Sequence, residues 1–253
     1  MTTFKDKLSE YYNKFNEDKR LDHRHGQVEF ITSMKYINEY LSANDKIVDI
    51  GAGAGRYSIE LKKKGYDVTA VELCRPNIGK IKVNDPTLKV VEANATDLSM
   101  FKDDEFDVVI MFGPMYHLYS KQDKLKALSE AKRITKKYIF VTYIMNEYSV
   151  IEYAFKDNHY KKIKDKLDEN YHIDDKDALF FQVRIEDIDE LNNECGLKLI
   201  KRFASDGPSD YMRSYINNMD EETFNAYIDF HLKTCERKEL LGASSHVVDI
   251  LTK

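Results

Sequence analysis

The sequence predicts an α/β protein built on a doubly wound, mostly parallel sheet, and three observations lead to this prediction. From residue 45 onward, short apolar segments alternate with segments of helical periodicity, as in a parallel sheet covered by helices on both faces. A glycine-rich turn at residues 51–55 directly follows the first apolar segment. The 253 residues are 42% hydrophobic, which is enough for the core of one domain.

The elements follow from the apolar pattern in chain order. Apolar runs predict seven strands, at residues 46–50, 67–73, 88–93, 106–112, 138–143, 197–204 and 246–251. Helices are predicted where apolar residues recur about every 3.6 positions or where a glycine ends the segment, at residues 4–16, 26–42, 55–64, 121–134 and 184–195. Residues 210–241 predict two further helices, and the charged stretch 146–180 predicts a helix at 160–169.

We expect one domain, residues 1–253, in which a regular core carries three additional segments. The core is expected at residues 45–143, 183–206 and 245–253. The additional segments are an N-terminal helical lid and two helical insertions, at residues 1–44, 144–182 and 207–244. Because these segments have no place in the sheet, we expect them to form a helical cap over one end of it.

Composition and charge exclude several classes of protein. With 39 basic and 44 acidic residues, the net charge of −5 excludes binding of nucleic acid through bulk positive charge. Apolar runs such as residues 108–112 are too short to cross a bilayer, and the charged N-terminus does not resemble a secretory signal. Cys74, Cys195 and Cys235 form no C-x-x-C pair, so we expect neither a disulfide framework nor a thiolate metal site, and a cytoplasmic location.

The glycine turn belongs to the most specific segment, residues 47–55, Ile-Val-Asp-Ile-Gly-Ala-Gly-Ala-Gly. Glycines let the backbone approach a ligand closely, and the next helix begins with free N–H groups. The spacing differs from the Gly-x-Gly-x-x-Gly of dinucleotide sites, and Asp49 would repel a pyrophosphate but attract an ammonium group. Glu72 ends the next strand, where it can accept the hydroxyls of a ribose, and Asp97 follows the third strand, where it can accept from an adenine amine. S-adenosylmethionine has an ammonium group, a ribose and an adenine, and no phosphate.

On these residues the chain resembles a class I S-adenosylmethionine-dependent methyltransferase. The resemblance covers residues 46–143 and continues more weakly through the sixth strand and residues 246–253, which are similar to the antiparallel last strand of that family. It implies a Rossmann-like seven-stranded sheet, S-adenosylmethionine as cofactor and S-adenosylhomocysteine as product. It also implies that the cofactor-binding residues are Asp49, Gly51, Ala52, Gly53, Gly55, Glu72, Leu73, Thr96, Asp97 and Phe112.

The fourth strand runs into residues 112–118, Phe-Gly-Pro-Met-Tyr-His-Leu. This segment resembles a small-molecule subgroup of the family that carries Gly-Pro-x-Tyr-His-Leu. It departs from the Asn/Asp-Pro-Pro-Tyr pattern of enzymes that methylate base or glutamine amines, because Met115 replaces the second proline. His117 is the candidate general base, and the alternative is a helix-start histidine bonded to backbone. Tyr116 is the second candidate catalytic residue, since an aromatic face suits a sulfonium or a substrate, and packing is its alternative.

Four further residues are predicted to contact the acceptor. Tyr11, Tyr12 and Arg24 lie in the expected lid, and Tyr143 ends the fifth strand. We expect no metal site, because Asp97 is the only strong acidic candidate at a strand end and no histidine pair has a zinc setting.

The sequence thus favours a methyltransferase that acts on an O, N or S nucleophile of a small molecule, enclosed by the insertions. The alternatives are a methyltransferase of peptides, proteins or RNA, and a non-catalytic protein that binds S-adenosylmethionine. A dehydrogenase, which would bind a nicotinamide cofactor, is a distant fourth. We expect no membrane and no nucleic-acid partner, and the chain can be a monomer or a homodimer.

Overall fold

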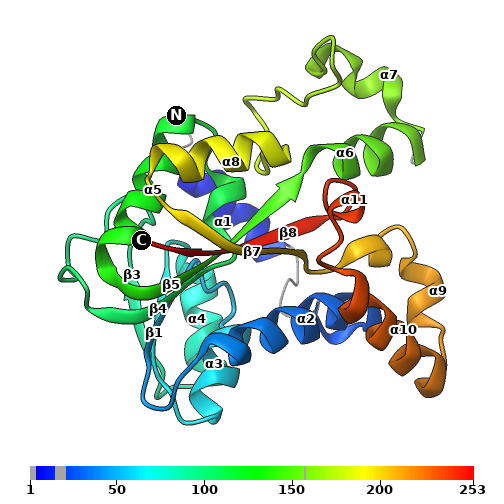
Figure 1. The fold of residues 1–253 in the computed structure, drawn as a ribbon. Helices are drawn as coiled ribbons and strands as arrows, with labels where there is room; N and C mark the ends of the chain where they lie inside the picture. The colour runs from blue at the N-terminus through cyan, green and yellow to red at the C-terminus, as the bar shows by residue number, and fades with distance from the viewer. Residues whose placement is uncertain (1–3, 15–20, 157) are drawn as a thin grey trace.

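The computed structural model describes residues 4–14, 21–156 and 158–253 of the chain. Seven strands form one sheet in the order β3-β2-β1-β4-β5-β8-β7 (Figure 1). Their bounds are β1 (Lys46–Ile50), β2 (Asp67–Glu72), β3 (Lys89–Glu92), β4 (Phe106–Met111), β5 (Thr135–Met145), β7 (Lys198–Ala204) and β8 (His246–Thr252). A short strand, β6 (Gln182–Val183), pairs with the end of β5. β8 runs antiparallel to both of its neighbours, and the pairs from β3 to β5 are parallel, so the predicted fold class is confirmed.

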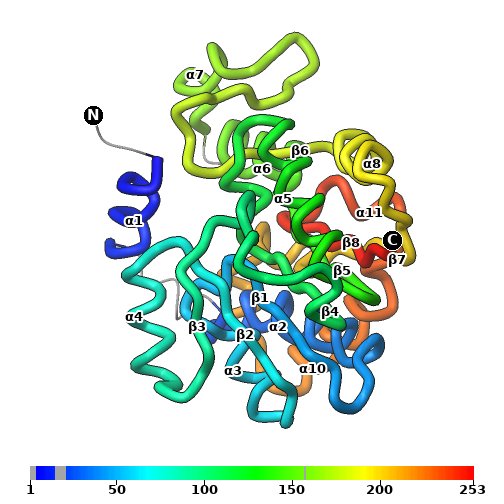
Figure 2. The backbone as a smooth tube through the Cα atoms, turned by 90° about the vertical axis from the view of Figure 1, so that its left-hand side faces the viewer, coloured from blue at the N-terminus to red at the C-terminus, as the bar shows by residue number. Residues whose placement is uncertain are grey.

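Helices cover both faces of the sheet because both faces are apolar. On one face, α5 (Lys121–Ile134) and α8 (Ile185–Glu194) pack into the larger core cluster. On the other face lie α2 (Arg24–Tyr40), α3 (Arg56–Lys63) and α4 (Arg75–Asn84). The buried Tyr36 ring stacks on Phe203 of β7 at 3.9 Å between centroids, so α2 is part of the core. The expected lid, residues 1–44, therefore contains a core helix as well as α1 (Phe4–Lys14), which packs against α4 (Figure 2).

The remaining helices flank the sheet, and all of them except α10 have only four or five residues. They are α6 (Asn146–Ser149), α7 (Tyr160–Ile163), α9 (Arg213–Asn217), α10 (Glu221–Thr234) and α11 (Lys238–Leu241). The predicted helix at 160–169 is wrong beyond its first turns: α7 ends at Ile163, a 3-10 turn follows at Lys164–Lys166, and Leu167 then bridges to Ile173. No residue of Tyr160–Lys166 is buried, so apolar packing does not hold a longer helix against the core. Three helices, not two, occupy residues 210–241, and α4 and β6 were not predicted.

The topology determines which edge of the sheet can form a binding crevice. The chain proceeds from β1 outward to β2 and β3, and then crosses to β4 on the opposite side of β1. The connections that leave β1 and β4 therefore diverge, and a crevice forms outside their carboxyl ends. The glycine turn follows β1, and the Gly-Pro-Met-Tyr-His-Leu segment follows β4, so both segments meet at this crevice.

His231 of α10 predicts a pH dependence of stability. Its side chain is 2% exposed, and burial lowers its pKa to about 4, from an ordinary value of 6.5. Below pH 6.5 the unfolded state takes up a proton that the folded state does not, so the stability from neutral His231 is present above pH 6.5 and lost toward pH 4. Between pH 7 and pH 5, wild type should lose about 1–2 kcal/mol more unfolding free energy than His231→Gln. Urea denaturation of both proteins at the two pH values measures this, and equal pH dependence would contradict it.

Candidate functional site

A cavity of about 700 Å³ opens at the carboxyl edge of the sheet, at the switch point between β1 and β4. Three parts of the chain line it: the glycine turn with the ends of β2 and β3, the segment after β4, and residues from α1 to α4. Lining residues include Leu8, Tyr12, Glu29, Asp49, Gly51, Ala52, Gly53, Tyr57, Glu72, Leu73, Asn77, Asn94, Phe112, Pro114, Tyr116 and His117. A volume of this size accommodates a nucleoside-sized cofactor and a small second ligand.

The glycine turn is held in a conformation that side chains would obstruct. Gly51 has φ +73°, and its N–H donates to the Val71 carbonyl oxygen at 2.8 Å. A Cβ at this position would lie 2.6 Å from Cδ of Pro114, so the turn and the segment after β4 are in direct contact. Gly53, at φ +56°, and Gly55, at φ +86°, also adopt the left-handed region that glycine enters without strain. The turn therefore presents bare backbone to the cavity.

Asp49 brings a buried carboxylate to the wall of the cavity. It is 2% exposed, and the Ser58 hydroxyl donates to its Oδ2 at 2.6 Å. Burial raises the pKa of Asp49 to about 6, and the charge of Glu72 acts in the same direction, whereas the hydrogen bond from Ser58 opposes the rise. An ammonium group placed beside Asp49 would favour its ionised form. The wall beside Asp49 thus suits the ammonium group of an amino acid and disfavours a phosphate group.

Glu72 lies at the end of β2 and closes the same wall. Its Oε2 accepts from the backbone N–H of Gly53 at 2.7 Å, and its Oε1 accepts from that of Cys74 at 2.8 Å. Burial raises the pKa of Glu72, and these two backbone hydrogen bonds partly offset the rise. The two bonds fix the carboxylate, and each oxygen keeps a further lone pair that can accept from a ribose hydroxyl. Leu73 continues the wall beyond Glu72.

The end of β3 departs from the prediction. Ala93, Asn94 and Ala95 line the cavity, whereas Thr96 and Asp97 are not among the described lining residues. The exposed Asp97 carboxylate accepts from the backbone N–H of Ser99 at 3.2 Å, and hydrogen bonds from Ser99 lower its pKa. A tight turn between Asn94 and Asp97 turns the chain away from the crevice, so the polar residue at this wall is Asn94.

The segment after β4 forms the opposite wall. Phe112 lines the cavity, and its carbonyl oxygen accepts a hydrogen bond from the Tyr116 hydroxyl at 2.8 Å. Pro114–His117 is a 3-10 turn in which Met115 is buried in the core while Tyr116 and His117 face the cavity. The turn therefore sets an aromatic ring and an imidazole side by side at this wall.

His117 joins this wall to α1. Its Nδ1 lies 2.8 Å from the carbonyl oxygen of Leu179, which can only accept, so Nδ1 carries the proton. Its Nε2 consequently accepts from the Tyr12 hydroxyl, at 2.9 Å. Burial lowers the pKa of His117 to about 4, which keeps the imidazole neutral at physiological pH. The lone pair on Nε2 thus belongs to a neutral base whose hydrogen-bond partner is a phenol from α1.

Comparisons with known proteins agree with this geometry. Residues 48–140 match the family profile described as "Methyltransferase domain". Over 135 residues the chain is 29% identical to an rRNA adenine N-6-methyltransferase of Limosilactobacillus reuteri, covering 50% of this chain and 49% of that protein. The chain therefore spans about half the length of that curated relative.

Residues 48–140 are therefore similar to a methyltransferase domain. Two solved structures share its fold. A SAM-dependent methyltransferase from Archaeoglobus fulgidus has a TM-score of 0.61 at 18% identity, covering 96% of this chain and 100% of that one. The magnesium protoporphyrin IX methyltransferase of Synechocystis, solved with bound S-adenosylhomocysteine, has a TM-score of 0.56 at 11% identity, covering 94% and 87%.

Of the four acceptor contacts predicted from the sequence, only Tyr12 is among the described lining residues. The Tyr11 ring packs edge-on against Phe180, at 5.3 Å between centroids. The Arg24 guanidinium lies over the ring of Phe224 on α10. Tyr143 is 1% exposed within the core cluster that contains α5 and α8, because alternate residues of β5 face opposite sides of the sheet.

Several residues of the candidate site were not predicted from the sequence. Tyr57 of α3 and Asn77 of α4 line the cavity, as does Glu29 of α2. Among the described residues, Glu29, Asp206 and His246 also form the one group of three potential metal ligands, with ligand atoms within 4.8 Å of one another. These three residues are far apart in the sequence and have no motif spacing, so no sequence signal could join them. None of the described helices is both long and apolar enough to span a membrane.

Proposed function

We propose that the protein is an S-adenosylmethionine-dependent methyltransferase that acts on an O, N or S nucleophile of a small molecule in the cytoplasm. The observation that carries the proposal is the single cavity that combines the glycine turn, Asp49 and Glu72 with the wall formed by Tyr116 and His117. The hydrogen bond from Tyr12 to His117 fastens α1 across this cavity. An acceptor that reaches the reacting methyl group would therefore have to fit under a helix, which favours a small molecule.

The residues present suit S-adenosylmethionine part by part. In this proposal Asp49 holds the ammonium group above the glycine turn, and Glu72 accepts from the ribose hydroxyls. Leu73 flanks the adenine. Asn94 contacts the edge of the adenine, in place of Thr96 and Asp97, which the sequence predicted there. The bound cofactor supplies a methyl group on a positively charged sulfur, an electrophile with a good leaving group. The chain has then to orient the acceptor, exclude water and, where needed, remove a proton.

Tyr116 and His117 are the proposed catalytic residues. Tyr116 lines the cavity, and an aromatic ring suits the positive charge of a sulfonium. His117 is neutral, so it can accept a proton, and the Tyr12 hydroxyl on its Nε2 offers a route from the acceptor through the phenol. Positioning by the cavity can supply much of the remaining acceleration.

RNA methylation is a second candidate, favoured by the named activity of the bacterial relative. Two features of this chain weigh against it. The segment after β4 departs from the Asn/Asp-Pro-Pro-Tyr pattern, and the overall charge is negative. The test below therefore includes an RNA pool.

Isothermal titration calorimetry should show binding of S-adenosylmethionine and S-adenosylhomocysteine and no binding of NAD. The reason is the buried Asp49 carboxylate beside the turn, which would repel a pyrophosphate. Consumption of S-adenosylmethionine against separate small-molecule, peptide and RNA pools, read by mass spectrometry of the products, then identifies the acceptor class. NAD binding without S-adenosylmethionine binding would refute the assignment, and turnover confined to the RNA or peptide pool would refute the small-molecule acceptor.

A further inference from the structure

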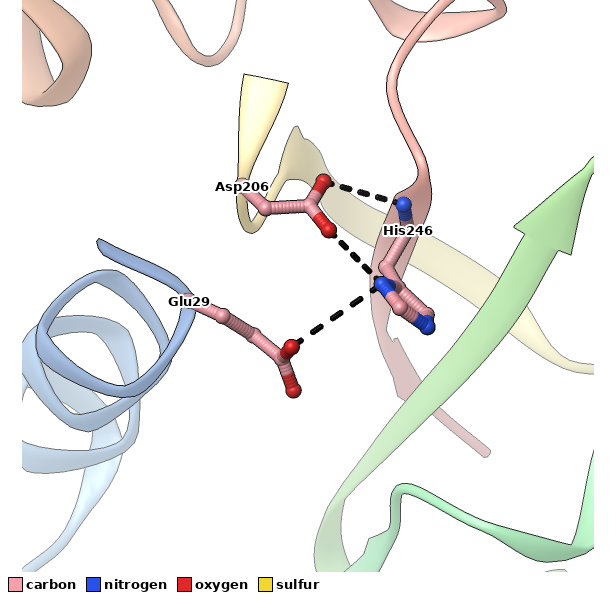
Figure 3. A group of neighbouring side chains, drawn as sticks. All are labelled: Glu29, Asp206 and His246. Carbon is pink, nitrogen blue, oxygen red and sulfur yellow. Dashed lines mark hydrogen bonds and ion pairs between the residues drawn. The ribbon is translucent and has the colours of Figure 1, made fainter. Parts of the chain in front are cut away.

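A buried cluster of one histidine and two carboxylates lies beside the cavity. Asp206, which follows β7, accepts from both the backbone N–H and the Nδ1 of His246, the first residue of β8, at 3.0 and 2.7 Å (Figure 3). Glu29 of α2 approaches from the other side, with Oε2 3.9 Å from the same Nδ1 (Figure 3). Asp206 thus fixes the imidazole in orientation, and Glu29 lies against its Nδ1 edge.

This cluster belongs to the half of the cavity that the proposed cofactor residues do not use. Glu29 lines the cavity, and the ring of Tyr116, which also lines it, lies 6.2 Å from the imidazole of His246. Because β8 runs antiparallel, its first residue lies at the same edge of the sheet as the ends of β4 and β5. Glu72 and Asn94 lie at the ends of β2 and β3, on the opposite side of β1. The cluster therefore borders the acceptor end.

The cluster is built to hold positive charge. The carboxylate oxygens of Glu29 and Asp206 lie within 4.8 Å of each other, in a region where both side chains are buried. Burial raises the pKa of Asp206, and the charges of Asp210 and Glu29 raise it further, while His246 counteracts them. Among the described residues that line the cavity, the buried carboxylates are Asp49, Glu72 and Glu29. Asp49 and Glu72 are proposed to bind the cofactor, which leaves Glu29.

We propose that Glu29, together with the ring of Tyr116, binds the ammonium group of the methyl acceptor, so that the substrate class is a primary or secondary amine. A carboxylate and an aromatic ring that line the same cavity can together recognise an ammonium group, which donates a charge-assisted hydrogen bond to the carboxylate and makes a cation–π contact with the ring. Asp206 and His246 are positioning residues: the Asp206 carboxylate orients the imidazole of His246, and this imidazole lies against Glu29. This inference rests on the proposed methyltransferase function and names the acceptor for it.

The chemistry balances for an amine. The bound ammonium gives one proton to the Glu29 carboxylate, and the freed nitrogen lone pair forms the new N–C bond. The C–S bond of the methyl donor breaks, and its electron pair stays on sulfur. The nitrogen of the product is again positively charged, which the Asp206 carboxylate stabilises. Glu29 then releases its proton to water and returns to the carboxylate form. A phenolate or thiolate acceptor would bring a negative charge beside two buried carboxylates, which is unfavourable.

The test measures binding to the whole protein saturated with S-adenosylhomocysteine. The probes are benzylamine, 2-phenylethylamine and N-methylbenzylamine, with benzyl alcohol, 2-phenylethanol and phenylacetate as shape-matched neutral and anionic controls. Amines should bind at least about tenfold more tightly than the alcohols, and Glu29→Gln should weaken amine binding about tenfold to hundredfold. Glu60→Gln, the same change at another position on the cavity wall, should leave amine binding unchanged.

Several outcomes would overturn the inference: no amine binding, equal or tighter binding of the alcohols or phenylacetate, or unchanged amine binding in a folded Glu29→Gln variant. Calorimetry with Zn²⁺ alone tests the competing occupant, and stoichiometric Zn²⁺ binding that Glu29→Gln abolishes, without amine selectivity, would also overturn it. Binding of S-adenosylhomocysteine is measured first. Its absence would refute the proposed function, whereas its presence without amine selectivity would refute this inference alone.

Discussion

His117→Asn is expected to lower the single-turnover rate of methyl transfer about 10²–10⁴-fold while cofactor affinity holds. The imidazole of wild type is neutral, and its Nε2 accepts from the Tyr12 hydroxyl at the cavity wall. Asparagine keeps a polar group but offers no base. Rapid-quench measurement with saturating S-adenosylmethionine and an identified acceptor gives the rate.

Two variants of α1 separate the roles around His117. Tyr12→Phe removes the phenol on Nε2 and should slow transfer if the proton passes through it. Tyr11→Phe makes the same change on the neighbouring ring, which packs against Phe180, and should leave the rate unchanged. Because the pKa of His117 is lowered to about 4, its base form persists at pH 5, so His117 should add no acid limb to the rate between pH 5 and pH 8. A His117→Asn rate within about threefold of wild type would remove His117 from catalysis and leave orientation as the main source of acceleration.

Glu72→Ala should raise the dissociation constant of S-adenosylmethionine about tenfold to hundredfold. A charged acceptor that binds hydroxyls contributes about 1.5–3 kcal/mol, which corresponds to this range. The variant also removes the acceptor of the Gly53 and Cys74 N–H groups, so the glycine turn loses its anchor on β2. Calorimetry measures the constant, and thermal unfolding confirms that the variant is folded.

Asp97→Ala is the matched control for Glu72→Ala. Asp97 is exposed and is not among the described lining residues, so its removal should leave cofactor affinity unchanged. If Asp97→Ala lowered cofactor affinity as much as Glu72→Ala, Asp97 would have to contact the edge of the adenine. An unchanged constant in folded Glu72→Ala would place the ribose elsewhere.

The sequence by itself determined the sheet and one wall of the site. A strand that is buried on both faces has a continuous run of apolar residues, so β1 was predictable from its local sequence. A backbone that must approach a ligand closely requires glycine, so the turn at residues 51–55 was predictable as well. Glu72 was predictable because it ends β2 and the ends of neighbouring parallel strands meet at one edge. The segment with Tyr116 and His117 was predictable for the same reason, since it follows β4.

Tertiary structure alone decided which residues at that edge face the cavity. Tyr143 lies toward the carboxyl end of β5, yet its position on the pleat turns the side chain into the core. Asp97 follows β3, but a tight turn carries it to the surface. The low pKa of His117 results from burial by packing, and the hydrogen bond with Leu179, which is distant in the chain, partly opposes it. The grouping of Glu29 with Asp206 and His246 joins α2 to two strand ends, and such contacts arise from packing of whole elements, which no local pattern of residues encodes.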